Sequence, residues 1–167
     1  SIYLGGDKGT GKTVLPHYLG KLLPDKPFVY IDCHNSALIN DGYLDNQHFE
    51  LASEGILFLD DIHRLSNIDQ NKILAWLDKN RLEKDISLIA SGPNHLTEQF
   101  RSYGIHEQLL SEISSVNLSL PIIKEMTSEI DDFIKYFSKK YKNGVQLNEM
   151  MHSEIDYFKT REWIGNF

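Results

Sequence analysis

The sequence predicts an α/β domain with a five-stranded parallel sheet flanked by helices, followed by a small α-helical unit. Short apolar segments of β-forming residues alternate with helical segments up to Pro121, and beyond it the apolar residues recur only at helical spacing. A glycine-rich segment joins the first expected strand to the first expected helix. Strands that are separated by helices of this length are typical of a parallel sheet covered on both faces.

Strands and helices follow one another in regular alternation in the α/β part. Strands are expected at Ile2–Leu4, Phe28–Ile31, Ile56–Asp60, Ser87–Ala90 and Val116–Leu120. Helices are expected at Lys12–Leu23, Gln47–Ser53 and Ile68–Asn80, and in one or two pieces between Leu96 and Ile113. Apolar residues recur at helical spacing in the third helix, and Ser66 or Asn67 stands in its N-cap position.

The last quarter of the chain is expected to be helical. An apolar stripe predicts one helix, and Thr127 or Ser128 stands before it as a cap. The stripe consists of Ile130, Phe133, Ile134, Phe137 and Tyr141. Asn143 and Gly144 interrupt this helix, and a second helix is expected over Asn148–Phe158.

Composition and charge narrow the class of protein. With 41% hydrophobic and 25% charged residues, the 167-residue chain is typical of a globular protein rather than a disordered, collagen-like or disulfide-rich one. Its apolar runs are too short to span a membrane, no secretory signal opens it, and the single Cys33 fits a reducing cytoplasm. The net charge of -7 argues against binding of duplex DNA by this segment alone. Because the chain opens within a strand and stops without a tail, we expect it to be cut from a longer polypeptide.

The segment from Gly6 to Thr13 has the spacing of a phosphate-binding loop, which is glycine, four residues, glycine, lysine and threonine. Glycines let backbone amides approach phosphate oxygens, and the following helix directs its free amides and the positive end of its dipole at the same anion. We expect Lys12 to reach the β- and γ-phosphates of ATP and the hydroxyl of Thr13 to help hold Mg²⁺. The alternative is a relic loop that keeps only its shape. The expected nucleotide-binding residues are Gly6, Asp7, Lys8, Gly9, Thr10, Gly11, Lys12, Thr13 and Val14.

A second motif, Asp60-Asp61, stands where the expected strand Ile56–Asp60 ends. In phosphate-loop proteins the first carboxylate at such a strand end orients water on Mg²⁺, and the next can polarise the attacking water. We therefore expect Asp60 and Asp61 to be catalytic, with Thr13 and Asp60 at the metal; the alternative is a solvated pair of aspartates. Asp61 is one carbon shorter than a glutamate, so its carboxylate lies about 1.5 Å further back, which weakens the case for hydrolysis.

Further segments form an ordered pattern with these two motifs. They are Gly5–Thr13, Lys26–Cys33, Phe49–Ala52, Gly55–Ile62, Leu118–Pro121 and Trp163–Asn166. Together they resemble the AAA+ domain of bacterial enhancer-binding proteins, the sigma-54-type transcriptional activators and response regulators. The resemblance implies a P-loop NTPase core over residues 1–121 and a truncated helical lid over residues 122–167. It also implies ATP and Mg²⁺ as ligands, self-association into a ring or dimer, RNA polymerase as a partner, an upstream receiver or sensory domain, and a downstream helix-turn-helix domain that binds DNA.

The chain departs from the pattern of this family in the parts that act on polymerase and on ATP. The Gly-Ala-Phe-Thr-Gly-Ala loop, through which the family contacts sigma-54, is expected between the second and third strands, and no such sequence occurs here. Asp32 replaces the asparagine with which the family switches its catalytic glutamate, and Asp61 replaces that glutamate.

The sensor and arginine-finger positions also differ. Asn94 matches the first sensor of the family only with a shift, and the second-sensor arginine would follow the last residue of this chain. The places of the arginine fingers hold His106 and Glu112, which leaves Arg101 as a distant candidate. Because an arginine finger stabilises developing phosphate charge across a subunit interface, its loss predicts slow hydrolysis.

Three functions are open at this point. The leading hypothesis is an ATP-binding regulatory module of a bacterial transcription factor, with weak or absent hydrolysis and without action through sigma-54. The second is a working mechanochemical ATPase that activates transcription, in which Asp61 and an unaligned arginine suffice. The third is a sensor that binds cyclic di-GMP, as related regulators of the family do. Whether the chain is an ATPase is therefore left open.

Overall fold

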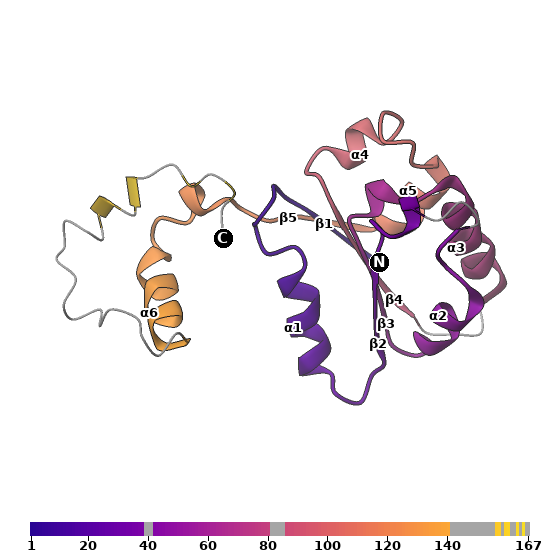
Figure 1. The fold of residues 1–167 in the computed structure, drawn as a ribbon, viewed down its shortest axis with the longest axis horizontal. Helices are drawn as coiled ribbons and strands as arrows, with labels where there is room; N and C mark the ends of the chain where they lie inside the picture. Colours follow the sequence, from indigo (N-terminus) through magenta and orange to yellow (C-terminus); the bar gives the residue numbers. More distant parts are fainter. Residues whose placement is uncertain are drawn as a thin grey trace. The chain divides into compact units, whose positions relative to one another are not determined.

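The computed structural model describes residues 1–38, 42–80 and 86–140, together with residues 156, 157, 159, 160, 163 and 165. The chain divides into two compact units (Figure 1). The first consists of Ser1–Gly6 and Gly11–Leu120, and the second consists of Asp7–Thr10 and Pro121–Phe167.

Five parallel strands form one sheet in the first unit, as the sequence predicts (Figure 1). They are β1 (Ile2–Gly5), β2 (Phe28–Asp32), β3 (Ile56–Asp60), β4 (Ser87–Gly92) and β5 (Val116–Ser119). Their order is β2-β3-β4-β1-β5, and the register pairs Asp32 with Asp60 and Gly5 with Gly92. Because all the strands run in one direction, the residues that follow them meet at one edge of the sheet.

Short helices connect these strands and cover the sheet. Within residues 1–140 the α-helices are α1 (Val14–Leu22), α2 (Asn46–Leu51), α3 (Asn67–Asn80), α4 (Leu96–Gln99), α5 (Glu107–Ile113) and, in the second unit, α6 (Ile130–Lys140). Three 3-10 turns are also present in the described residues, namely η1 (Ser36–Leu38), η2 (Ile62–Arg64) and η3 (Ile123–Glu125). Ser66 caps α3, because its hydroxyl accepts a hydrogen bond from the Asp69 amide at 3.1 Å.

Helix α1 begins two residues later than the sequence indicates. Residues 11–13 still form a turn, in which the Leu15 amide donates to the Gly11 carbonyl at 3.0 Å. Pro16 lies in the first turn of α1, where a backbone N–H has no partner within the helix. The proline is therefore tolerated, although it makes the sequence look less helical than the segment is.

Apolar side chains pack on both faces of the sheet. Alternate residues of each strand point to opposite faces, so Leu57 and Leu59 belong to one cluster and Ile56 and Phe58 to the other. The larger cluster packs beneath α2, α3 and α5, and the smaller one beneath α1. Figure 1 shows α1 on one side of the sheet and α2, α3 and α5 on the other. All of β3 is buried, which explains why apolar residues follow one another without a break from Ile56 to Leu59.

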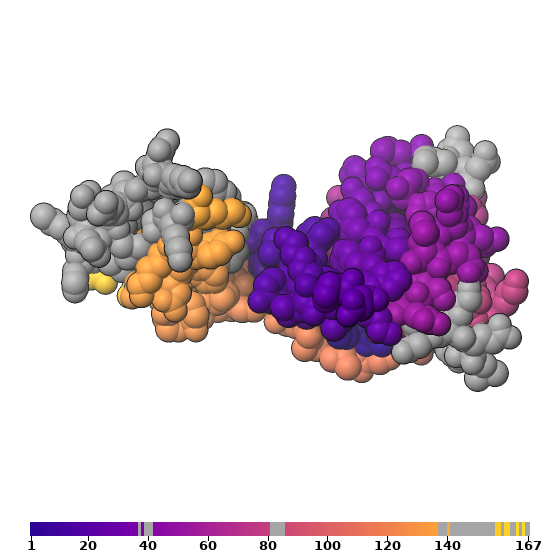
Figure 2. Space-filling view, turned by 90° about the horizontal axis from the view of Figure 1, so that it is seen from below, coloured from indigo at the N-terminus to yellow at the C-terminus, as the bar shows by residue number. Residues whose placement is uncertain are grey.

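On the face shown in Figure 2, much of the surface comes from the indigo N-terminal part of the chain, to which α1 belongs. The outer side of α1 carries exposed apolar residues at successive turns, namely Val14, Tyr18 and Leu22. None of the helices in the described part of the chain is long and apolar enough to cross a membrane.

Beyond Pro121, the described residues of the second unit form η3, α6 and a few positions near the C-terminus. The predicted stripe of α6 is partly visible: Ile130 is buried, whereas the side chain of Phe137 and all of Tyr141 lie outside the described residues. The Lys159 ammonium lies 3.3 Å from a carboxylate oxygen of Asp131 and joins α6 to the C-terminal segment. Most of the helix predicted over Asn148–Phe158 also lies outside the described residues, as does the predicted break at residues 143 and 144.

Candidate nucleotide-binding site

The phosphate loop leaves β1 at the edge of the sheet where the strands end. Its start is fixed to β4, because the Gly6 amide donates to the Gly92 carbonyl at 3.2 Å. A side chain at Gly5 would come within 3.2 Å of the Asn94 backbone, so the close approach of the two strand ends requires glycine there. Asn94 also accepts a hydrogen bond from the Ser119 hydroxyl at 2.9 Å, which ties the ends of β1, β4 and β5 together.

The tip of the loop is a tight turn. Both the amide and the hydroxyl of Thr10 donate to the Asp7 carbonyl, at 3.3 and 2.9 Å. Gly9 and Gly11 have φ angles of 79° and 90°, in the left-handed region that glycine adopts without strain. The spacing of glycines in the motif therefore follows from the backbone, which turns twice between Gly6 and α1.

The two side chains expected to act on phosphate and metal lie at the end of the loop. The Lys12 ammonium donates to the Gly6 carbonyl at 2.8 Å, at the residue where the loop begins. The exposed Thr13 hydroxyl donates to a carboxylate oxygen of Asp60, Oδ2, at 2.8 Å. Val14, the last residue of the expected set, is 70% exposed at the first position of α1.

Asp60 is the most heavily hydrogen-bonded side chain of the site. Besides Thr13, the Tyr30 hydroxyl donates to Oδ2 at 3.3 Å, and the Ser91 hydroxyl donates to Oδ1 at 2.5 Å. These three hydroxyls come from the loop, from β2 and from β4, and Asp60 itself ends β3. A carboxylate held on both oxygens by separate strands has little freedom to rotate, which suits a group that must orient a metal or its water.

Tyr30 stands between Asp60 and an aromatic cluster on the α1 face. The ring of His17 lies 5.0 Å from that of Tyr30 and 5.3 Å from that of Phe28. Burial, the nearby charges of Asp60 and Asp32, and the hydrogen bond to Asp60 raise the pKa of Tyr30 to about 12. The phenol therefore stays protonated at neutral pH and acts as a hydrogen-bond donor.

Asp61 leaves the strand in a left-handed conformation, with φ 56° and ψ 50°. Non-glycine residues rarely adopt this region, although aspartate does so more readily than most. The pKa of His63, two residues further along the chain, is lowered mainly by burial of its ring. The charge of Asp61 opposes this lowering, whereas the positive charges of Arg64 and Lys12 add to it. The His63 Nδ1 atom is buried without a hydrogen-bond partner among the described residues.

Asp32, Arg101 and His106, at which the sequence differs from the pattern of the family it resembles, lie in different parts of the first unit. The Asp32 carboxylate accepts a hydrogen bond from the His34 amide at 2.9 Å, directly after β2. The Arg101 guanidinium is 84% exposed and lies 4.0 Å from the Glu107 carboxylate. The His106 backbone, at the start of α5, donates to the Gln70 side chain at 2.9 Å.

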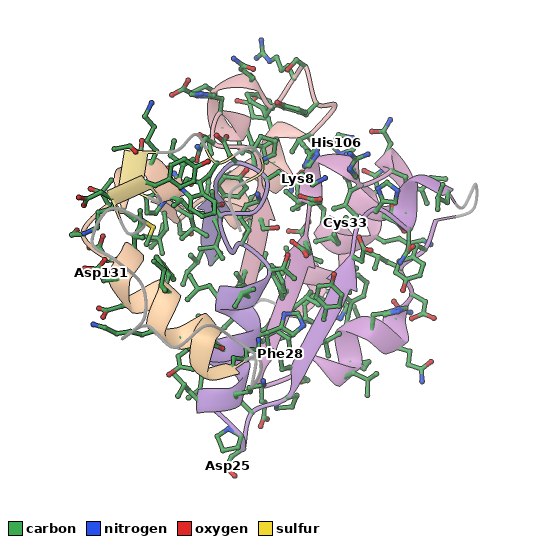
Figure 3. All side chains as sticks on the ribbon, turned by 60° about the vertical axis from the view of Figure 1, so that its left-hand side comes forward. Lys8, Asp25, Phe28, Cys33, His106 and Asp131 are labelled. Carbon is green, nitrogen blue, oxygen red and sulfur yellow. The ribbon has the colours of Figure 1, made fainter. Side chains whose placement is uncertain are left out.

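Cys33 has the environment of a core residue. It follows β2, and Figure 3 labels it at the opposite end of that strand from Phe28. The side chain is fully buried, and this burial, together with the charge of Asp60 and of neighbouring aspartates, raises the pKa of the thiol well above its usual value. A thiol that is this buried and this hard to ionise is suited to packing in the core rather than to nucleophilic chemistry.

Sequence reasoning missed Tyr30 and Ser91. Tyr30 stands in the expected strand Phe28–Ile31, and Ser91 directly follows the expected strand Ser87–Ala90, but their contact with Asp60 depends on which strands are neighbours. Tyr30 precedes Asp60 by 30 residues and Ser91 follows it by 31, and both reach the Asp60 carboxylate because β2 and β4 flank β3. The sequence offers only one local signal for these contacts, a residue with a hydroxyl group in or beside an apolar strand. This signal does not indicate which residue the hydroxyl contacts.

Known proteins share this sequence pattern over nearly the whole chain. The family model described as sigma-54 interaction domain matches residues 1–123. The chain belongs to the sigma-54 interaction domain family. Its sequence is 26% identical over 197 residues to the Nif-specific regulatory protein of Enterobacter agglomerans, covering 99% of this chain and 37% of that protein. Since this chain has 167 residues, the relative carries at least 30 residues in the matched region that have no counterpart here.

Solved structures share the fold of this sigma-54 interaction domain. NtrX from Brucella abortus in complex with ATP has a TM-score of 0.77 and 21% identity, over 99% of this chain and 44% of that one. The P-loop NTPase domain of an Escherichia coli protein described as a sigma-54 transport activator has a TM-score of 0.53 and 22% identity, over 71% of this chain and 82% of that one. The predicted P-loop NTPase fold of the AAA+ class is therefore confirmed.

Proposed function

We propose that this sigma-54 interaction domain is an ATP-binding regulatory module of a bacterial transcription factor. The observation that carries the proposal is the contact between the Thr13 hydroxyl and Asp60 at 2.8 Å, directly after a loop with two left-handed glycines. This contact unites the end of the phosphate loop with the acidic end of β3, which are the two parts that an ATP-bound Mg²⁺ requires.

The residues fit ATP and Mg²⁺ by their chemistry. The loop from Gly6 to Val14 would surround the phosphates, with Lys12 as the charged contact, and Thr13 and Asp60 would hold the metal. When bound, Mg²⁺ neutralises phosphate charge. In the described residues no three histidine, cysteine or acidic side chains are grouped to hold a metal by themselves. A Mg²⁺ ion bound through one carboxylate and nucleotide phosphates needs no such group.

Weak or absent hydrolysis is the second part of the proposal. Asp60 and Asp61 are the candidate catalytic residues, but the shorter Asp61 stands in a left-handed turn, and Asp32 stands where the family has asparagine. The exposed Arg101 lies beside the carboxylate of Glu107, which would compete with phosphate for its charge. Slow turnover would make the nucleotide a persistent switch that favours assembly of copies of this chain into a ring or dimer.

The third part concerns the polymerase. The connection between β2 and β3 holds only η1, α2 and the turns around them in its described residues, and its sequence lacks the sigma-54 contact motif of the family. We therefore propose a cytoplasmic factor that acts on RNA polymerase in a form other than the sigma-54 one. A receiver or sensory domain upstream and a DNA-binding domain downstream would complete it.

A second candidate function is a mechanochemical ATPase that activates transcription through sigma-54. The match of residues 1–123 to a family described by its interaction with sigma-54 favours it. The two candidates differ in one property, which is ATP-dependent contact with sigma-54. Crosslinking of this chain to sigma-54 only when ATP is present would support the second candidate and overturn the third part of the proposal.

Binding of ATP itself is tested by calorimetry with Mg²⁺, on the wild type and on Lys12→Ala. Loss of a charged contact to phosphate should weaken binding about tenfold or more, since such a hydrogen bond contributes about 1.5–3 kcal/mol. Lys79→Ala, at an exposed position near the end of α3, is the matched control and should bind as the wild type does. Equal affinity of the wild type and Lys12→Ala, or no binding by either, would overturn the proposal.

A further inference from the structure

A single buried hydroxyl contacts both aspartates of the candidate site. Ser91, in β4, is fully buried, and its Oγ lies 2.5 Å from Asp60 Oδ1 and 3.0 Å from the Asp61 amide nitrogen. A backbone N–H can only donate, so Ser91 must accept from Asp61 and direct its own proton to the Asp60 carboxylate. Both contacts therefore have a fixed direction.

The contact to Asp61 falls where the chain leaves β3. Asp61 has φ 56°, so the alternation of side chains along the strand ends at this residue. Its carbonyl accepts a hydrogen bond from the Arg64 amide at 2.9 Å, and its own amide donates to Ser91. Hydrogen bonds on both the amide and the carbonyl of Asp61 thus hold its left-handed conformation, and Ser91 makes the one to the amide.

The contact to Asp60 completes the fixation of that carboxylate. Thr13 and Tyr30 donate to Oδ2, whereas Ser91 is the donor recorded on Oδ1. Without Ser91, the carboxylate would keep its contacts on one oxygen and could rotate about the bond that carries it. The Asp61 amide would lose its partner at the same time.

We infer that Ser91 is a positioning residue of the nucleotide site, whose hydroxyl fixes the Asp60 carboxylate and the Asp61 backbone relative to each other. The inference rests on the proposed function, because the orientation of Asp60 matters for the metal that accompanies ATP. Because Ser91 is fully buried, it would act through the two aspartates rather than by contact with nucleotide or metal. Its loss should therefore impair the metal-dependent part of ATP binding and spare the part made by the phosphate loop.

The first experiment compares ATP affinity in excess Mg²⁺ and in EDTA for the wild type and Ser91→Ala. Affinity in Mg²⁺ should fall about tenfold, as for loss of one contact to a charged group, while affinity in EDTA should stay within about twofold. Ser87→Ala, at the exposed start of the same strand, should change neither value. Equal weakening in both buffers, or no change in either, would overturn the inference.

A second experiment needs no nucleotide. Urea unfolding of the wild type, Ser91→Ala, Asp60→Asn and the double variant forms a double-mutant cycle. The change in the unfolding equilibrium constant of the double variant should differ from the product of the two single changes by about threefold or more. Additive effects would overturn the inference whatever ATP does. Coupling in this cycle without ATP binding by the wild type would instead overturn the proposed function. If Ser91→Ala does not fold, Ser91→Cys keeps the side-chain size with weaker hydrogen bonds and should show both effects in smaller measure.

Discussion

Replacement of Asp69 by asparagine should strongly destabilise the first unit. Asp69 lies fully buried in α3 and holds the connection between β2 and β3. Its Oδ2 accepts from the Tyr43 amide at 2.9 Å and from the hydroxyls of Ser36 and Ser66, and its Oδ1 accepts from the Leu44 amide at 3.0 Å. Because each oxygen faces a backbone N–H, the NH₂ group of the replacing asparagine side chain would meet a donor in either orientation.

The cost can be estimated from these contacts. One hydrogen bond to a charged acceptor is lost and one buried N–H is left unpaired, which together amount to about 3–5 kcal/mol. That is a large part of the stability of a typical domain, about 5–15 kcal/mol. Urea unfolding at pH 7, followed by far-ultraviolet circular dichroism, measures the change. Asp78→Asn, at an exposed position of the same helix, is the matched control and should fall within about 0.5 kcal/mol of the wild type.

The same variant has a pH signature. Burial alone would raise the pKa of Asp69, but the hydrogen bonds from Ser36, Tyr43, Leu44 and Ser66 outweigh it and hold the pKa below the ordinary value of 3.8. A lowered pKa in the folded state stabilises the fold above the unfolded pKa and ceases to do so as the pH falls through the folded pKa. The difference between wild type and Asp69→Asn should therefore shrink below pH 3.8. A difference under about 1 kcal/mol at pH 7, or one that does not change with acid, would refute this reasoning.

Three further predictions follow from burial and packing. Cys33, buried and with a raised pKa, should react with a thiol reagent at least about a hundredfold more slowly in the native protein than in urea; equal rates would contradict its placement. The pKa of Tyr30 is raised from 10.0 to about 12, so the free energy of unfolding should fall as the pH rises between these values, and it should fall less in Tyr30→Phe. An equal fall in both proteins, measured by urea unfolding, would contradict the raised pKa. Gly55→Ala should cost about 1–3 kcal/mol or more, since a side chain there would lie 2.1 Å from the Pro27 carbonyl oxygen; wild-type stability in the same assay would show that the entry to β3 differs.

Much of the fold could be predicted because its signals are local. Strands β1 to β4 each contain a short apolar run, and β3, which is buried throughout, gives the clearest one. Strand β5 instead alternates apolar and polar residues. The phosphate loop is recognisable because its geometry demands glycine at Gly9 and Gly11, which leaves a fixed spacing in the sequence. Helix α3 was predicted within a residue because Ser66 caps it through its own side chain.

The contacts that give the site its shape could not be predicted, because they join distant parts of the chain. Ser91 and Tyr30 meet at Asp60 only once the strand order is known, and the order of a parallel sheet leaves no local pattern. Asp69 looks like a surface residue of an amphipathic helix, and its burial depends on the backbone of Tyr43 and Leu44. The left-handed Asp61 has no signal at all beyond its residue type.

ATP turnover by this chain tests the proposed regulatory function most directly. It is measured per protomer over a wide range of protein concentration, under conditions where ATP is bound, beside Lys12→Ala. We expect bound ATP with phosphate release no faster than that of Lys12→Ala at every concentration. Release that exceeds the variant and climbs with concentration would mean that copies of the chain complete each other's sites. That result would contradict the proposed regulatory module with slow turnover and support the mechanochemical ATPase.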